Sequence, residues 1–298
     1  MSIAPSLMEK VLNVAMESGA DFAELYLEDT YENHMTLKSE KITEAISGKL
    51  YGAGIRLFFG HEVIYTYTNE VNEKGLLEAA TLAAAAQKGS TQTPIKNLST
   101  YKYDSIHKYN TLPWQMAKEK KVQFLQQMDK AGRAFSSEIT QVSANLNEVY
   151  KKVWIANSAG RLSEETRQYS YIVCQSVAES AGVREYGMHR EGVLSSSDYF
   201  ETLDFKDLAL KSAAMASRNL KAKYAPAAEL PVVIANGFGG VIFHEACGHG
   251  LETTTVASGA SVFSDKLGQK ISNPCVTAID DGTLPNLYGS LSVDDEGH

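Results

Sequence analysis

The sequence predicts an α+β protein of mixed helices and largely antiparallel sheets, arranged in more than one domain. Segments in which apolar residues recur at helical spacing stand on both sides of groups of strand-like segments. The strand-like segments follow one another with only short turns between them, which favours antiparallel pairing. The 298 residues are 44% hydrophobic, enough for the cores of two ordinary domains or more.

The first group of elements predicts an N-terminal α+β domain over residues 1–90. Apolar residues at helical spacing predict a helix over 6–18, which Gly19 ends. An alanine-rich helix is expected over 72–88. Between the helices, strands rich in Tyr, Leu, Ile and Val are expected over 22–27, 35–39, 50–58 and 62–68.

Residues 91–112 are rich in Ser, Thr, Pro and Asn and have weak periodicity, so we predict a linker there. A second α+β domain is predicted over 113–225, with helices at 113–134 and 204–224. Its strands are expected over 138–146, 148–157, 161–179 and 181–191. Both domains therefore have a helix, strands, helix order. Since no residue-level repeat is evident, an internal duplication is only a hypothesis.

Residues 226–298 are predicted to be the start of a third domain. Val232-Val233-Ile234 is expected to be a short buried strand that leads into the sequence Asn236-Gly-Phe-Gly-Gly-Val-Ile-Phe-His-Glu-Ala-Cys-Gly-His-Gly-Leu-Glu252. This stretch concentrates two of the 7 histidines and two carboxylates within residues 244–252. The apolar run before them predicts a helix from about 237 to 250.

The residue types in this helix suit a metal hydrolase. Neutral imidazoles are good zinc ligands, and Glu245 directly follows His244, where it could take a proton from a water whose pKa the ion lowers. The familiar zinc-protease helix has its histidines at i and i+4. His244 and His249 are instead at i and i+5, a spacing that separates two side chains by roughly 140° on a regular α-helix.

A single inserted residue, accommodated as a π-bulge, would return both imidazoles to one side of the helix. Gly248 is the expected place for the backbone to give way, so we predict irregular structure near 247–249. The alternative is a buried helix with two incidental histidines. Glu252, about one turn after His249, is either a carboxylate that orients this histidine, a substitute ligand, or a surface residue at the helix end.

Three segments, 244–252, 279–286 and 289–297, together resemble the TldD/PmbA family, the so-called modulators of DNA gyrase. The chain is similar to the TldD type, which keeps the H-E-x-x-x-H motif that the PmbA type lacks. The resemblance implies a zinc metalloprotease acting on small or unfolded peptides, with His244 and His249 as zinc ligands and Glu245 as the general base. It also implies a homodimer, or a heterodimer with a PmbA-type subunit.

The family's third zinc ligand is a cysteine near the C-terminus of a longer chain. We therefore expect this sequence to be truncated before that ligand. A non-catalytic scaffold or partner subunit without the third ligand is the alternative function. An extended peptide that adds to a sheet edge is a further hypothesis, motivated by the family's peptide substrates.

Charge and composition exclude several classes of function. The 28 basic and 36 acidic residues give a net charge of −8 without a long basic run, so neither nucleic acid nor gyrase regulation by DNA binding is expected. No apolar stretch approaches the roughly 18 residues of a membrane helix. Three cysteines do not make a disulfide framework and suit a reducing compartment, so a cytoplasmic location is expected. Cys174 is expected in the core, and Cys275 on the surface.

Overall fold

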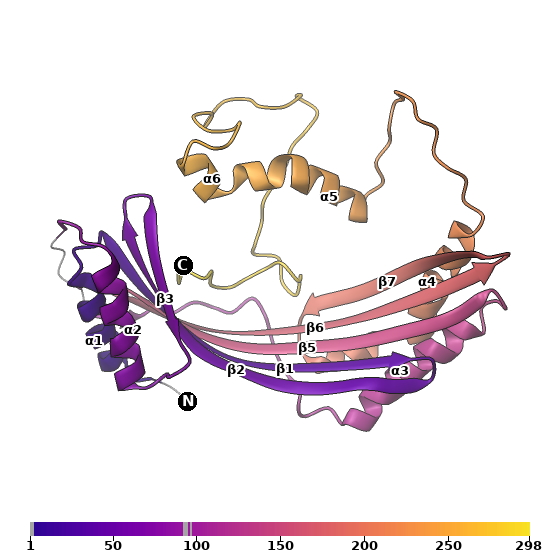
Figure 1. The fold of residues 1–298 in the computed structure, drawn as a ribbon, viewed down its shortest axis with the longest axis horizontal. Helices are drawn as coiled ribbons and strands as arrows, with labels where there is room; N and C mark the ends of the chain where they lie inside the picture. Colours follow the sequence, from indigo (N-terminus) through magenta and orange to yellow (C-terminus); the bar gives the residue numbers. More distant parts are fainter. Residues whose placement is uncertain (1–2, 92–94, 96) are drawn as a thin grey trace. The chain divides into compact units, whose positions relative to one another are not determined.

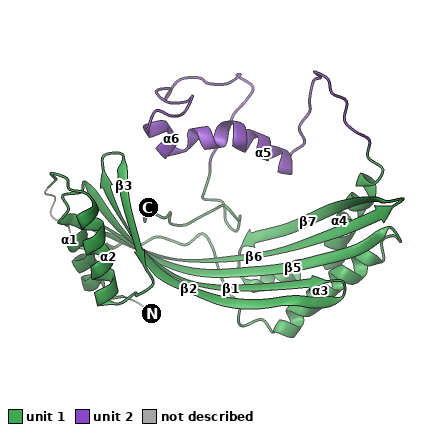
Figure 2. Ribbon diagram, viewed as in Figure 1, with its two compact units in different colours: residues 1–222, 281–298 green, residues 223–280 purple. Residues whose placement is uncertain are grey.

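The computed structural model describes residues 3–91, 95 and 97–298. Helices and a largely antiparallel sheet make up the chain, which confirms the predicted α+β class. The chain divides into two compact units (Figure 2). Unit 1 contains residues 1–222 and 281–298, and unit 2 contains residues 223–280. The chain therefore leaves unit 1 after residue 222 and returns to it at residue 281.

Unit 1 is built on one sheet, which has seven strands among the described residues (Figure 1). Its long strands are β1 (Phe22–Lys38), β2 (Lys41–Phe59), β3 (Glu62–Thr68), β5 (Ile139–Asn157), β6 (Arg161–Ser180) and β7 (Val183–Leu194). The order is β3-β2-β1-β5-β6, and both β7 and the short β4 (Ser99–Thr100) pair with β6. Except for β4, every neighbour pairs antiparallel. The two segments predicted as separate α+β domains thus share one sheet.

Among the described residues of unit 1, four α-helices accompany the sheet: α1 (Pro5–Met16), α2 (Glu73–Ala86), α3 (Lys118–Arg133) and α4 (Phe205–Asn219). The side chains of Asn72 and Asp204 cap α2 and α4 by accepting hydrogen bonds from backbone N–H groups at 2.9 and 3.0 Å. The helix, three strands, helix order occurs twice, and the two copies meet where β1 pairs with β5. This symmetry agrees with the duplication hypothesis.

The helix pairs α1/α2 and α3/α4 lie at opposite ends of the sheet (Figure 1) and cover the same face of it. Leu25 and Leu27 of β1 pack in the cluster with α1 and α2, whereas Met35 and Leu37 pack in the cluster with α3 and α4. Because side chains alternate between the faces of a strand, these odd-numbered residues all point to one side. The opposite face receives part of the segment 281–298, through Val293.

A buried polar network lies between the two apolar clusters. The carboxylate of Glu148 on β5 is fully buried and accepts hydrogen bonds from Lys121, Asn33 and Ser197. The Lys121 ammonium also donates to the carbonyl of Pro113 at 2.6 Å. Each charge is thus paired and hydrogen-bonded, which is the condition under which burial of charge is tolerated.

Several predicted boundaries were wrong. β1 and β5 are each one long strand where the sequence predicted two, and β2 begins at Lys41, well before the predicted start. Residues 41–50 of β2 are exposed on both faces, so no alternation of burial marked them as strand. Helix α3 begins at Lys118 rather than 113. Residues 92–94 and 96 of the predicted linker lie outside the described residues.

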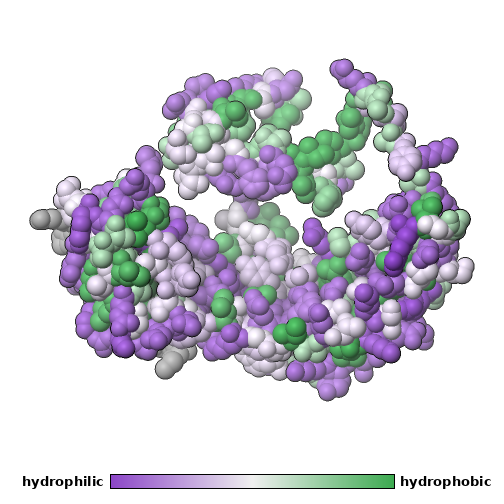
Figure 3. Space-filling model, viewed as in Figure 1, coloured by the Kyte–Doolittle hydropathy of each residue, from purple (hydrophilic) through white to green (hydrophobic). Residues whose placement is uncertain are grey.

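The predicted buried strand at Val232-Val233-Ile234 is also wrong. These residues have no regular secondary structure and are exposed. A strand needs a neighbour to satisfy its backbone groups, and residues 223–280 contain no strand. Their hydrophobic surface extends over the first helical turns of unit 2 (Figure 3). Among the described residues, no helix is both long and apolar enough to cross a membrane.

Candidate metal centre

The histidine-rich stretch forms an irregular helix in unit 2. A 3₁₀ turn over Gly237–Gly239 leads into α5 (Gly240–Phe243), which continues as a π-helical turn over His244–Gly248 and a 3₁₀ turn over His249–Leu251. The predicted helix and its irregularity between the two histidines are therefore confirmed. Helix α6 (Thr253–Ala257) follows after Glu252, whose extended backbone ends the irregular helix.

The π-helical turn brings the two imidazoles together. The ring centroids of His244 and His249 lie 4.4 Å apart, with an angle of 64° between the planes. One nitrogen of each ring and one carboxylate oxygen of Glu245 all lie within 4.8 Å of one another. Two zinc–nitrogen bonds of about 2.1 Å at a tetrahedral angle place the nitrogens roughly 3.4 Å apart, so the side chains would rotate toward one another to share an ion. This donor set, two imidazoles and a carboxylate, is one that zinc accepts.

Gly248 leaves the space that the His244 ring uses. A Cβ atom at this position would lie 3.0 Å from Nδ1 of His244 and 3.5 Å from its Cγ. The absence of a side chain at Gly248 thus allows the imidazole to lie against the helix backbone. The same residue was predicted as the place where the helix becomes irregular, and it is the last residue of the π-helical turn.

The carboxylate of Glu252 holds the His249 ring. Its Oε1 lies 2.6 Å from Nδ1 of His249, while Nε2 of the same ring lies 3.7 Å from a carboxylate oxygen of Glu245. The hydrogen bond with Glu252, followed by its negative charge, raises the pKa of His249 above the usual value. A carboxylate on one ring nitrogen fixes the orientation of the ring and leaves the other nitrogen for a metal. This contact favours the orienting role that the sequence left open for Glu252.

Local packing supports the end of the irregular helix. A Cβ atom on Gly250 would lie 3.0 Å from the Phe263 ring, so the turn packs directly on this aromatic side chain. The Ser261 hydroxyl donates to the carbonyl of Gly250 and accepts from the N–H of Phe263 at 3.0 Å. The loop after α6 thus contacts the turn that contains His249.

Among the described residues, none of the cysteines and no other histidine belongs to the cluster of His244, Glu245 and His249. Cys174 is buried, and burial raises the pKa of its thiol to about 11, whereas Cys275 is exposed, as predicted for both. Cys247 lies between the two motif histidines but is not a member of the cluster. His107 is buried in unit 1, outside the cluster. Its Nδ1 accepts the N–H of Asn286 at 3.2 Å.

Three models of one protein family match the chain in order along its length. Residues 23–87 match domain 1 of the PmbA/TldA metallopeptidases, residues 111–220 match the central domain and residues 227–298 match the C-terminal domain. Together the three matches cover most of the sequence, and the last contains the histidine motif.

Similar proteins carry related names. The metalloprotease TldD homolog of Haemophilus influenzae is 31% identical over 311 residues, which cover 99% of this chain and 63% of that protein. A metalloprotease of Methanocaldococcus jannaschii is 31% identical over 301 residues, which cover 97% of this chain and 63% of that protein. The chain therefore spans about three fifths of the length of these relatives.

Solved structures show the same fold. A Thermotoga maritima protein named as a candidate modulator of DNA gyrase superposes with a TM-score of 0.78 at 17% identity, over 98% of this chain and 66% of that one. A Bacteroides thetaiotaomicron protein with the same description gives a TM-score of 0.78 at 15% identity, over 98% and 67% of the two chains. At these identities the likeness concerns the fold alone.

Proposed function

Because the chain belongs to the PmbA/TldD metallopeptidase family, we propose that it provides the zinc-binding motif of a peptidase that hydrolyses small or unfolded peptides. The observation that carries this proposal is the convergence of His244 and His249 across one π-helical turn, with Glu245 beside them. We assign both histidines as zinc ligands and Glu245 as the general base.

A zinc ion held by the two histidines would polarise a substrate carbonyl and lower the pKa of a water at the site. Glu245 takes one proton from the attacking water as its oxygen bonds to the carbonyl carbon. Glu245 then delivers that proton to the amine nitrogen as the carbon–nitrogen bond breaks. Glu252 holds Nδ1 of His249, which would leave Nε2 of this ring to bind the ion.

The position of Glu245 admits a second role, because its carboxylate lies within the same donor cluster as the histidines. Glu245→Gln separates the two roles. A general base that does not ligate zinc can be neutralised without loss of zinc, whereas a ligand cannot. We expect Glu245→Gln to bind zinc normally and to abolish hydrolysis.

The test compares zinc content and cleavage of an unstructured peptide for this chain and for a version extended to the length of its relatives. Each is prepared with the natural sequence, with Glu245→Gln and with His244→Ala. The proposal requires that zinc be lost in His244→Ala and that hydrolysis be lost in both variants. Hydrolysis that persists in Glu245→Gln would rule out the assigned mechanism.

The exposed apolar surface of unit 2 favours a second candidate function, a non-catalytic partner subunit. Val232, Val233, Ile234 and Phe238 are all more than half exposed, and hydrophobic surface of this kind marks interfaces. Association as a homodimer, or with a PmbA-type subunit, would cover it. The mass of the chain in solution, alone and with such a subunit, tests the association. The number of zinc ions bound per chain distinguishes the two functions, because a peptidase requires the ion and a non-catalytic partner subunit does not.

A further inference from the structure

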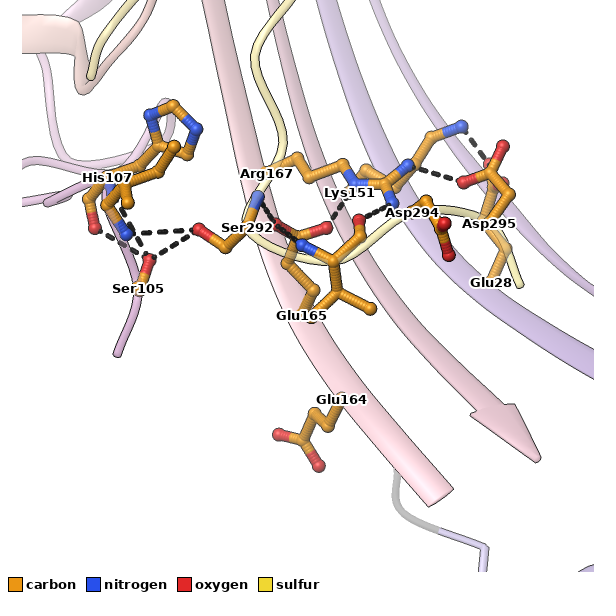
Figure 4. Close-up of polar contacts among 12 residues, drawn as sticks. Glu28, Ser105, His107, Lys151, Glu164, Glu165, Arg167, Ser292, Asp294 and Asp295 are labelled. Carbon is orange, nitrogen blue, oxygen red and sulfur yellow. Dashed lines mark hydrogen bonds and ion pairs between the residues drawn. The ribbon is translucent and has the colours of Figure 1, made fainter. Parts of the chain in front are cut away.

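Residues 291–297 contact the face of the sheet opposite the helices through a cluster of polar side chains on β6 (Figure 4). Two charged members of the cluster, Glu165 and Arg167, have side chains that are only 1% and 5% exposed. They pair with each other at 2.5 Å. Both belong to unit 1, as do residues 291–297.

The two charged side chains bind the main chain of the segment. Oε1 of Glu165 accepts the N–H of Ser292 at 2.8 Å and the N–H of Val293 at 3.2 Å. Nη2 of Arg167 donates to the carbonyl of Val293 at 2.8 Å, and Nη1 donates to the Asp295 carboxylate at 2.8 Å. A carboxylate and a guanidinium thus bind two consecutive N–H groups and a carbonyl of one short segment.

Contacts on either side extend this site. The Ser163 hydroxyl donates to the carbonyl of Gly297 at 2.7 Å, and Nη1 of Arg161 donates to the same oxygen at 3.1 Å. The Val293 side chain is buried against Val153 and Ile155 of β5. The segment is therefore held by hydrogen bonds to its backbone near both ends and by the apolar contact of Val293.

The energetics require an occupant for this site. A buried ion pair costs free energy unless its remaining donors and acceptors are satisfied. Without residues 291–297, Oε1 of Glu165 and both terminal nitrogens of Arg167 would lose the partners that they have in the structure. A charged group left without its partner costs more than the bond itself contributes.

We infer that Ser163, Glu165 and Arg167 form a main-chain binding site whose occupant is residues 291–297 of the same chain. This contact acts as a latch. Unit 2, which contains the metal motif, begins after residue 222 and ends at residue 280, so the latch fastens the chain where it returns to unit 1. Before unit 2 in the sequence, α4 is packed into the core of unit 1 through Ala213 and Ala216. The binding of residues 291–297 does not depend on the proposed function. Only the statement that this contact ends the segment with the metal motif rests on it.

Hydrogen exchange of the whole chain, followed by mass spectrometry of the peptide that covers 287–298, tests the latch. Arg167→Met removes the guanidinium that β6 contributes to the site. Val293→Asp disrupts the apolar contact of residues 291–297 and leaves the polar side chains of the sheet unaltered. Glu164→Gln is the matched control, because Glu164 bonds to Lys152 and Trp154 instead of the segment. Digestion with a protease that cleaves after Asp and Glu reports release independently in Arg167→Met and in Glu164→Gln, which add no cleavage site.

We expect slow exchange and resistance to cleavage at 291–297 in the natural chain and in Glu164→Gln. Arg167→Met and Val293→Asp should each exchange about tenfold faster or more in this peptide, with β5 unchanged. Exchange of the natural segment at the rate of an unfolded peptide would overturn the inference, as would full protection in Val293→Asp. If Arg167→Met does not fold, Val293→Asp decides. The readout needs no metal, so failure of the peptidase proposal would not affect it.

Discussion

The imidazole rings of His244 and His249 lie 4.4 Å apart, centroid to centroid, although five positions separate them in the sequence. On a regular α-helix the same spacing would direct them roughly 140° apart. The π-helical turn over His244–Gly248 removes this difference, so that the i, i+5 pair brings its rings together as an i, i+4 pair does on the regular helix of the familiar zinc-protease motif. The geometry of the helix therefore decides whether the motif binds metal.

Gly248→Ala should weaken zinc binding while it stabilises the helix. A Cβ atom would lie 3.0 Å from Nδ1 of His244 and displace the ring, whereas alanine favours helix by about 1 kcal/mol over glycine. We expect a loss of zinc affinity of about tenfold, comparable with the loss of a residue that orients a ligand. Competition titration with a chromogenic chelator measures the affinity.

Gly240→Ala is the matched control, because it adds the same methyl group to α5 where no atom lies within 4 Å. It should leave zinc affinity unchanged. Equal affinities for the two variants would show that Gly248 does not position His244.

Glu252→Ala should reduce zinc affinity by about 10- to 100-fold, because His249 loses the carboxylate that holds its Nδ1. Glu252→Gln retains an oxygen that can accept the hydrogen bond, so its loss should be smaller. Isothermal titration with zinc at one pH compares the three proteins. Natural affinity in Glu252→Ala would mean that this carboxylate is only a surface residue.

The candidate site was largely predictable from the sequence. The unusual spacing of His244 and His249 required either a distorted helix or no site at all, and Gly248 indicated where the distortion would occur. The role of Glu252 was not predictable, because a carboxylate at the end of a helix is common. Only the 2.6 Å contact with His249 distinguishes it.

Lys121→Met should destabilise unit 1 by about 3–5 kcal/mol, because it leaves the buried carboxylate of Glu148 without its cation. Denaturant unfolding followed by circular dichroism measures the change. Lys120→Met is the neighbouring control. Lys120 pairs with Glu201 on the surface, so its loss should cost no more than about 1 kcal/mol. Similar costs for both lysines would contradict the role of the buried network.

Because of His107, the free energy of unfolding of unit 1 should decrease as the pH falls. Burial lowers its pKa below the usual 6.5, although the charge of Glu165 and the backbone of Ser290 act in the opposite direction. The unfolded chain therefore takes up the proton first as the pH falls. Stability is present above about pH 6.5 and is lost as the pH falls through the lowered pKa.

Thermal unfolding at several pH values checks this expectation. His107→Asn keeps an oxygen to accept the N–H of Asn286 and removes the titrating group, so the variant should lose less stability between neutral and acid pH. An identical pH dependence in the natural chain and in His107→Asn would show that this histidine does not contribute.

The strands were predictable where buried and exposed residues alternate along them. They were not predictable where only hydrogen bonds to a neighbouring strand define them. The alternation in β6 and β3 predicted both strands closely. Residues 41–50 of β2 are exposed on both faces and are held only by β1, and their apolar residues do not alternate regularly with polar ones. The apolar run at 232–234 gave the opposite error, because hydrophobicity without a neighbouring strand does not make a sheet.

Contacts distant in the sequence were beyond prediction. Glu165 and Arg167 alternate with apolar residues as in any strand with one polar face, and nothing nearby identifies their partner more than 120 positions later. The sequence also gave no reason to join residues 1–90 and 113–225 in one sheet. Pairing of β1 with β5, through the register Tyr31 to Tyr150, requires the structure.

X-ray absorption at the zinc edge of the zinc-loaded chain tests the shared metal site most directly. Two imidazole nitrogens at about 2.0–2.1 Å are expected for the natural chain, and one in His244→Ala and in His249→Ala. A spectrum with no imidazole, or one that does not change when either histidine is replaced, would contradict the account.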